Sequence, residues 1–227
     1  MRINSFAPFG VETTVNPERF RNRQDAGKQL AARLAVYAGN PDVTVIGLPR
    51  GGVPVAAEIA ASLAAPLDIF VVRKLGVPGQ SELAMGAIAE GGVEIRNQDV
   101  ITALGISERD VEEVAARERL ELDRRGRLLR GSRIATPLKG RIVILVDDGL
   151  ATGATMEAAV AAIRSLEPRR LVVAVPVGAA DTSRRIAALV DELICVACPE
   201  WFGAVGQWYD DFTETTDADV KALLDRR

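Results

Sequence analysis

The chain has 227 residues, of which 48% are hydrophobic, and its 28 basic and 31 acidic residues give a formal net charge of −3. This length allows one well-buried core, and the charge balance gives no reason to expect nucleic acid or an anionic membrane as a partner. The chain has no histidine, which removes the usual Ser-His and Cys-His nucleophile systems and weakens any hydrolase interpretation.

The sequence also argues against transport into or through a membrane. Residues 1–8 lack the apolar core of a signal peptide, and no later run approaches the roughly 20 apolar residues that span a bilayer. We therefore expect a soluble, cytoplasmic protein.

The first third of the chain predicts the beginning of a parallel sheet. The sequence Asn-Pro-Glu at residues 16–18 is typical of a helix start, and apolar residues follow at helical spacing as far as Tyr37. Two apolar segments, 43–47 and 67–72, predict strands, and residues 53–63 between them have helix-forming composition. Strand, helix and strand form a βαβ unit, whose two strands are parallel.

The middle of the chain predicts a long loop, a hairpin and a charged helix. Residues 73–85 are rich in glycine, proline and charge, and residues 86–89 and 93–95 predict short strands around a Gly-Gly turn. Ser107, with Asp110 three residues later, resembles a capping box that opens a long helix.

That helix allows more than one interpretation. Eight arginines lie between residues 109 and 133, which alone would suggest nucleic acid. Seven acidic residues between 108 and 123 are interleaved with most of them, as on a salt-bridged face exposed to solvent. We favour the salt-bridged face, with a dimer contact as the second interpretation.

The second half continues the alternation of strands and helices. Residues 143–146, 170–177 and 192–197 predict buried strands, and residues 155–166 and 182–189 predict the helices between them. The fold class that follows is α/β, with a doubly wound, mainly parallel sheet.

No repeat or low-complexity linker divides the chain, so the domain boundary comes from composition. We assign residues 1–198 to the α/β domain. Residues 199–227 hold both tryptophans and a short helix from Asp217, and we expect this tail to form a small hood subdomain or to pack on the body.

The two cysteines, Cys195 and Cys198, have C-x-x-C spacing, which raises the question of a redox or zinc site. A zinc site would need further Cys or His ligands, and a thioredoxin-like motif should open a helix. Because Cys195 lies in a segment of strand composition, we favour buried strand cysteines.

The most informative stretch, Val143–Thr155, joins a buried strand to two carboxylates and then to an anion cradle. Asp147 and Asp148 follow the strand directly. Small residues after them let backbone N–H groups approach a ligand, and two threonines add hydroxyl donors where the next helix begins. The cradle consists of Ala151, Thr152, Gly153, Ala154 and Thr155.

This stretch resembles the phosphoribosyl-pyrophosphate signature of the type I phosphoribosyltransferases. The resemblance implies that Asp147 and Asp148 bind the 2′- and 3′-hydroxyls of the ribose and that residues 151–155 wrap its 5′-phosphate. Carboxylates suit a diol, whereas a phosphate needs the donors and the positive end of a helix dipole. The alternative is that the two aspartates merely end a strand and Thr155 merely caps a helix.

A second loop, Leu48–Gly52, lies at the carboxyl end of the first strand, where ligands bind in open α/β sheets. The N–H groups of Gly51 and Gly52 can point at an anion, and Arg50 can grip two phosphate oxygens. The loop resembles the pyrophosphate-binding loop of the family, which often contains a cis peptide at the position matching Arg50-Gly51. An ordinary Gly-Gly turn is the alternative.

Arg73 and Lys74 are expected to end the second strand and to lead into a lid over residues 75–85. The resemblance is to the flexible loop of the family, whose basic dipeptide contacts pyrophosphate. A solvated surface pair is the alternative for these two cations. Glu82 is the single carboxylate of the lid and is our candidate for deprotonating the incoming nucleophile.

The family mechanism implies Mg²⁺ as the cofactor. Departure of pyrophosphate leaves positive charge on the ribose and negative charge on the leaving group. Arg50 and Lys74 would stabilise the departure, while Asp147 and Asp148 would hold the ring and bind Mg²⁺ mainly through water or the ribose.

The acceptor is the least defined part of the reaction. Family members that use 6-oxopurines have an aspartate at the position of Ala151, so guanine and hypoxanthine are poor candidates, and the Asp-Asp-x-x-Ala-Thr-Gly pattern is closer to adenine-type enzymes. Aromatic residues of the tail could stack on a flat base or could form the core of the tail. They are Trp201, Phe202, Trp208, Tyr209 and Phe212.

The resemblance extends from about Pro17 to Cys198 and includes a group of bacterial phosphoribosyltransferases without an assigned acceptor. We expect phosphoribosyl pyrophosphate and a small-molecule acceptor of the nucleobase class as partners, no nucleic acid or membrane, and a homodimer as the usual assembly of the family. The alternative is a sensor that binds phosphoribosyl pyrophosphate or a nucleotide and acts through a protein partner.

Overall fold

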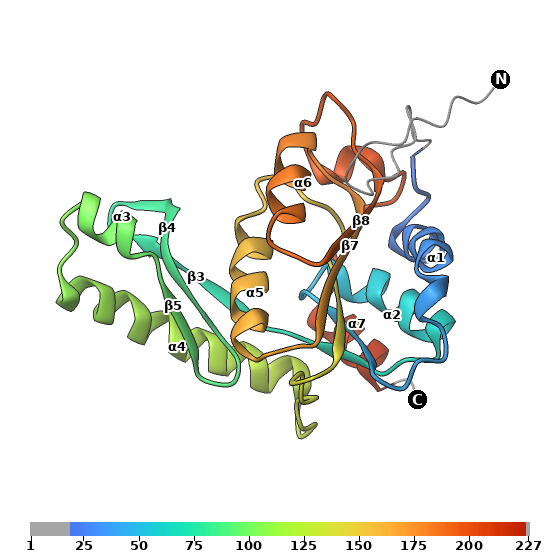
Figure 1. Cartoon of the computed structure of the whole chain (residues 1–227), viewed down its shortest axis with the longest axis horizontal. Helices are drawn as coiled ribbons and strands as arrows, with labels where there is room; N and C mark the ends of the chain where they lie inside the picture. Colours follow the sequence, from blue (N-terminus) through green and yellow to red (C-terminus); the bar gives the residue numbers. More distant parts are fainter. Residues whose placement is uncertain (1–18, 226–227) are drawn as a thin grey trace.

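The structure is a computed structural model that describes residues 19–225, apart from the side chains of residues 81 and 82. Its centre is a five-stranded parallel sheet with the strand order β2-β1-β6-β7-β8 (Figure 1). The strands are β1 (Val43–Gly47), β2 (Leu67–Ile69), β6 (Ile142–Val146), β7 (Arg170–Val177) and β8 (Glu192–Ala197). The predicted α/β fold with a parallel sheet is confirmed.

Helices cover both faces of this sheet because its strands are apolar on both faces. Alternate residues of one strand enter different clusters: Ile144 packs with the helices of one face, and Val143 and Leu145 pack with those of the other. The first face carries α1 (Arg23–Arg33) and α2 (Gly52–Leu63), and the second carries α5 (Ala154–Ser165) and α6 (Ala180–Ala187).

The start of α1 differs from the expectation. Its N-cap is Asn22, whose side chain accepts a hydrogen bond from the backbone N–H of Asp25 at 2.9 Å. Phe20, which was expected to be helical, forms an isolated parallel bridge with Tyr209 of the tail. The predicted helix start at residues 16–18 lies outside the described residues.

The prediction of a loop over residues 73–85 is wrong. This segment forms two strands of a separate antiparallel sheet, and only Pro78 and Gly79 make the turn between them. Alternating apolar residues, among them Leu75 and Val77, pack against the long helix that follows, and this burial outweighs the local glycine content. The sheet consists of β3 (Val72–Val77), β4 (Gln80–Ala89) and β5 (Val93–Arg96).

This small sheet and two helices form an arm that projects from the central body (Figure 1). The helices are α3 (Gln98–Ala103), which was not predicted, and α4 (Glu108–Arg130). The predicted capping of α4 is confirmed, because Oγ of Ser107 accepts from the backbone N–H of Asp110 at 3.2 Å.

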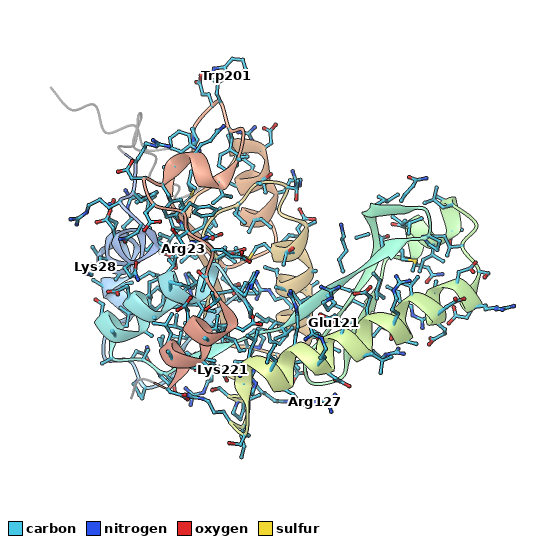
Figure 2. All side chains as sticks on the ribbon, turned by 180° about the vertical axis from the view of Figure 1, so that it is seen from behind. Arg23, Lys28, Glu121, Arg127, Trp201 and Lys221 are labelled. Carbon is cyan, nitrogen blue, oxygen red and sulfur yellow. The ribbon has the colours of Figure 1, made fainter. Side chains whose placement is uncertain are left out.

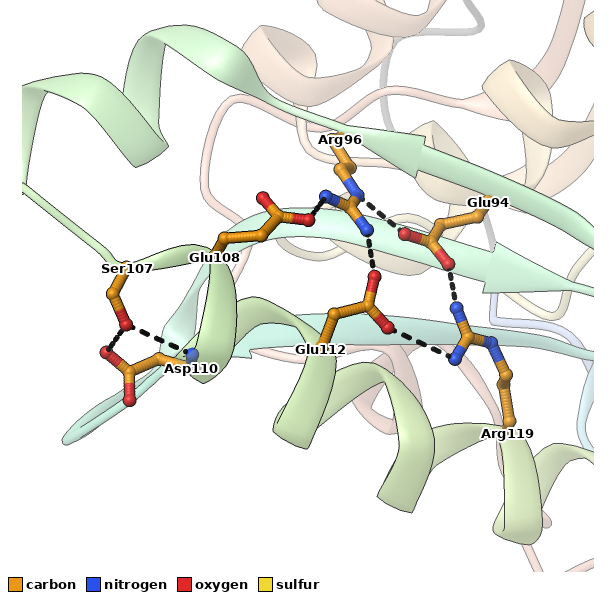
Figure 3. Close-up of polar contacts among 7 residues, drawn as sticks. All are labelled: Glu94, Arg96, Ser107, Glu108, Asp110, Glu112 and Arg119. Carbon is orange, nitrogen blue, oxygen red and sulfur yellow. Dashed lines mark hydrogen bonds and ion pairs between the residues drawn. The ribbon is translucent and has the colours of Figure 1, made fainter.

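The predicted salt-bridged face of α4 is also confirmed. Arg96 of β5 pairs with Glu94 at 2.6 Å and with Glu108 at 2.5 Å, and it also contacts Glu112 (Figure 3). Arg119 bridges from the helix to Glu94 and Glu112. The charges of the arm are therefore largely paired within the chain.

The tail folds back over the central body. It contains a short 3-10 helix, η2 (Val205–Trp208), and a terminal helix, α7 (Asp217–Leu224), whose Val220 and Leu224 pack into a cluster shared with α2 and α4. Another 3-10 turn, η1 (Ala35–Tyr37), follows α1. Among the helices of the described residues, none is both long and apolar enough to cross a bilayer.

Candidate active site

The loop that follows β1 and the loop that follows β6 meet at the carboxyl edge of the sheet, because these two strands are neighbours and are paired in register. Gly47 ends β1 opposite Val146, which ends β6. The backbone N–H of Leu48 donates to the carbonyl of Val146 at 2.9 Å. A Cβ on Gly52 would lie 2.5 Å from that same carbonyl oxygen, so the loop 48–52 needs glycine to come this close.

Gly51 lies against one of the two predicted diol-binding carboxylates. A Cβ at this position would lie 2.0 Å from Oδ2 of Asp148. A cis peptide does occur in this loop, but it joins Pro49 to Arg50, one bond earlier than the family pattern implied. The structure thus brings the residues of the predicted pyrophosphate loop against the predicted ribose site.

The carboxylates of Asp147 and Asp148 differ in their partners. Nε of Arg23 donates to Oδ2 of Asp148 at 2.8 Å, whereas Oδ1 of Asp147 accepts from the backbone N–H of Asp148 at 2.9 Å. Burial raises the pKa of Asp147 well above its usual value, and the neighbouring charge of Asp148 raises it further. Burial also raises the pKa of Asp148, against the lowering effect of Arg23.

The cradle residues surround the N-terminus of α5. Gly153 is the N-cap and has φ +79°, a conformation that favours glycine. Thr152 is exposed, and Thr155 is the second residue of the helix rather than its cap. The interpretation of Thr155 as a simple helix cap is therefore wrong, and the start of α5 has no side-chain cap that would compete with a ligand.

The basic dipeptide does not end a strand as expected, because Arg73 and Lys74 lie within β3. The side chain of Arg73 points toward helix α4, where its Nε and Nη2 donate to Oε2 of Glu118 at 2.9 and 2.7 Å. Strand alternation places Lys74 on the opposite face, which it shares with Val72, and Val72 packs against the cluster that contains α5. Of the two cations, Lys74 is thus on the face turned toward the cradle helix.

The predicted lid is a hairpin on the arm rather than a loop. Glu82 is the third residue of β4, and its side chain is outside the described part of the chain. Arg73, which pairs with Glu118, is not among the residues that the structure brings together with Asp147 and Asp148.

The tail supplies a wall of the site that the sequence did not predict in detail. The Tyr209 hydroxyl donates to the carbonyl of Asp148 at 2.7 Å. Nη1 of Arg23 donates to the carbonyl of Thr213 at 2.7 Å, and its guanidinium lies 3.9 Å from the centre of the Phe212 ring. No local pattern could have identified Arg23, since 125 residues separate it from Asp148.

The pyrophosphate-loop arginine is also bound by the tail. Arg50 pairs with Glu214 and lies 3.9 Å from Asp217, so two carboxylates occupy the guanidinium that was predicted to bind pyrophosphate. Both pairs are partly exposed to solvent. An anionic ligand at this loop must therefore compete with acidic side chains.

Several of the tail aromatics pack into the main hydrophobic cluster of the sheet, α1 and α2 rather than form a separate core of the tail. Tyr209 is buried, and Phe202 and Trp208 pack beside it with ring centres 6.5 Å apart. Trp201 is 89% exposed and points away from the body (Figure 2).

The cysteine interpretation holds in part. Cys195 is buried in β8, but Cys198 follows the strand and is only half-buried. Its thiol lies 3.6 Å from Oγ of Ser183, and the neighbouring Cys195 lowers the pKa of Cys198 to about 7. Both cysteines are free thiols.

Asp147 and Asp148 offer the carboxylate oxygens that Mg²⁺ accepts as ligands. Among the described side chains, no group of three or more His, Cys, Asp or Glu is arranged to hold a metal ion. Two cavities of about 520 and 450 Å³ are lined by the arm, by β1 and β2, by the loop after α4 and by the end of α5; among the described side chains, none of the predicted site residues lines either cavity.

Comparison with known proteins decides the family. A family model described as "Phosphoribosyl transferase domain" matches residues 18–213 of the chain. The chain belongs to this family. As the signature indicates, it is of type I, and its acceptor is unassigned.

Two family relatives come from Mycobacterium tuberculosis, strains CDC 1551 / Oshkosh and ATCC 25618 / H37Rv. They are named "Putative phosphoribosyl transferase MT0597" and "Putative phosphoribosyl transferase Rv0571c", and each is 51% identical over 207 residues. These residues make up 91% of the present chain, which spans only 46% of each relative. The crystal structure of TT1426 from Thermus thermophilus is similar over 91% of this chain and 97% of that one, with 44% identity and a TM-score of 0.83.

Proposed function

We propose that the chain transfers the 5-phosphoribosyl group from phosphoribosyl pyrophosphate to a nitrogen nucleophile, with a nucleobase as the acceptor class. The bond from C1 of the ribose to the pyrophosphate oxygen breaks, a bond from C1 to nitrogen forms, and pyrophosphate leaves. The observation that carries this proposal is the contact of Gly51 with Asp148, because it joins a pyrophosphate loop to a diol-binding pair.

The roles of the residues follow from charge. Asp147 and Asp148 accept hydrogen bonds from the ribose hydroxyls and favour the positive charge that develops on the ring. The N-terminus of α5 and residues 151–155 receive the 5′-phosphate. Arg50, with the amides of Gly51 and Gly52, receives the pyrophosphate once Glu214 has released the guanidinium.

Two assignments depend on the arm. We propose that Lys74 faces the leaving group, since its strand face is turned toward α5. Glu82 remains our candidate for accepting the proton of the nucleophile, a role that requires the hairpin to reach the acceptor. When bound, Mg²⁺ would neutralise charge on the pyrophosphate, with Asp147 and Asp148 holding it through water or the ribose.

The test is release of pyrophosphate from phosphoribosyl pyrophosphate with Mg²⁺ and a panel of bases and amines. We expect release with at least one acceptor, with adenine-type bases favoured over guanine and hypoxanthine because residue 151 is alanine. Asp148→Asn should weaken ligand binding, and Lys74→Ala should abolish turnover with little loss of affinity. A wild type that binds the ligand but releases no pyrophosphate would instead support a sensor.

A further inference from the structure

Two consecutive carbonyls of the phosphate cradle are hydrogen-bonded to helix α6. Oγ1 of Thr182 donates to the carbonyl of Ala151 at 2.7 Å, and Nη2 of Arg185 donates to the carbonyl of Thr152 at 2.8 Å. Thr182 and Arg185 are three residues apart, so they lie on the same face of the helix. One face of α6 therefore contacts the outer side of the cradle loop.

Helix α6 is a firm support for these contacts. The bridge between Leu150 and Gly178 ties the beginning of the cradle loop to the end of β7, with N–H to O distances of 2.8 and 2.9 Å. Ile186 is fully buried beneath the helix, and Thr182 is 5% exposed. Arg185 is fixed further by Oε1 of Glu157, which accepts from Nε at 3.2 Å and from Nη2 at 3.1 Å.

These contacts determine where the amides of the cradle point. In a trans peptide unit the C=O and the N–H of the next residue point in opposite directions. Because the carbonyls of Ala151 and Thr152 face α6, the N–H groups of Thr152 and Gly153 point away from this helix. In the part of the chain that the structure describes, neither amide donates to another protein group.

The packing at Gly153 shows how close the loop lies to α6. A Cβ on Gly153 would sit 2.5 Å from Cγ2 of Thr182 and 3.6 Å from Nη2 of Arg185. The cationic guanidinium on the carbonyl of Thr152 also polarises that peptide, which makes its N–H a stronger donor.

We propose that Thr182 and Arg185 are positioning residues for the 5′-phosphate: they hold the cradle carbonyls outward so that two free amides face the phosphate. The inference rests on the proposed function and adds two residues outside the signature motif to its donor site. The ligand class is the phosphomonoester of a five-carbon sugar, such as ribose 5-phosphate.

The test compares ligands that use different parts of the site. Binding of ribose 5-phosphate and of pyrophosphate is measured by calorimetry for Thr182→Val, Arg185→Gln and the wild type. Loss of one such hydrogen bond should weaken binding of ribose 5-phosphate roughly fivefold in each variant. Pyrophosphate, which is assigned to the loop 48–52, should bind as in the wild type, and a general loss of stability would not produce this difference.

Two further variants serve as controls. Arg184→Gln removes a neighbouring arginine that pairs with Asp181 in solvent, and it should leave binding of both ligands unchanged. Thr182→Ser keeps the hydroxyl and should bind ribose 5-phosphate like the wild type. If Thr182→Val does not fold, Arg185→Gln decides the question with the same expectation.

The outcomes are distinct. Wild-type affinity for ribose 5-phosphate in Arg185→Gln, or an equal loss for pyrophosphate, overturns this inference alone. A wild-type protein that binds neither ribose 5-phosphate nor phosphoribosyl pyrophosphate overturns both this inference and the proposed function.

Discussion

Gly51 lies so close to Asp148 that a Cβ on residue 51 would be 2.0 Å from Oδ2 of the aspartate. The same oxygen accepts a hydrogen bond from Nε of Arg23 at 2.8 Å, so it is held from two sides. Residue 51 must therefore be glycine because of the position of Asp148, which lies 97 positions later in the sequence. The loop 48–52 and the loop after β6 thus lie against each other.

Gly51→Ala should consequently damage the site. We expect at least a tenfold loss of affinity for phosphoribosyl pyrophosphate, since either the loop or Asp148 must move. Gly126→Ala on α4 is the control, because the one heavy atom near an added Cβ there is the end of the Glu90 side chain at 3.2 Å. Calorimetric binding checks both variants, and an unchanged affinity in Gly51→Ala would contradict the close packing.

Asp147 should make the free energy of unfolding depend on pH. Its pKa is raised in the folded protein, mainly by burial, so the folded state holds this proton more tightly than the unfolded state, whose pKa is about 3.9. The free energy of unfolding should therefore fall as the pH rises from about 4 through the folded pKa. Asp147→Asn should remove this part of the dependence and be more stable than the wild type at pH 8.

Urea unfolding at pH 4 and pH 8 measures this effect. Asp210→Asn is the matched control, because Asp210 is exposed and lies 3.7 Å from Arg19 at the surface. The Asp147→Asn variant should also bind the ribose ligand more weakly, a loss of function in exchange for stability. Equal pH dependence in Asp147→Asn and the wild type would show that this carboxyl is not penalised by burial.

Glu214 should compete with pyrophosphate for Arg50. The Glu214 side chain is 74% exposed, and exposed ion pairs contribute about 0–1 kcal/mol, so Glu214→Gln should raise the affinity for pyrophosphate by no more than about fivefold. The gain should shrink at high salt, because screening weakens the pair. Titration of pyrophosphate at two salt concentrations tests this, and weaker binding by the variant would mean that Glu214 orients Arg50 instead.

Arg130 should be essential for the stability of the arm. Its side chain is 10% exposed and pairs with Asp68 and Glu90, and Nη2 donates to the carbonyl of Ile69 at 2.9 Å. Arg130→Met leaves two carboxylates with low exposure and without their cation, which should cost about 3–5 kcal/mol.

Arg124→Gln is the control for that prediction. Arg124 lies on the same helix and pairs with Glu121 at 2.7 Å, but its side chain is 60% exposed, so its loss should leave the free energy of unfolding almost unchanged. Both values come from urea unfolding followed by circular dichroism. A difference of less than about 1 kcal/mol between the two variants would contradict the importance of the buried cluster.

Local sequence determined the central sheet. The segments 170–177 and 192–197 were predicted as strands and match β7 and β8, because an apolar run buried on both faces has few other stable arrangements. Ser107 as the start of α4 was predictable for a related reason: a side chain that bonds an amide three residues away is a local interaction. The glycines and small residues of the two loops likewise indicated close backbone approaches.

Tertiary structure decided the rest. Residues 73–85 have the composition of a loop, yet they form a hairpin because the long helix α4 offers an apolar surface that buries Leu75 and Val77. Arg23 and Glu214 reach the carboxylates and Arg50 only after the helix α1 and the tail have packed on the body. The sequence by itself indicated the strands of the central sheet, the carboxylate pair and the small residues of the cradle loop, whose interactions are short in range. Which distant side chains complete the site was decided by packing, since those contacts join residues more than 100 positions apart.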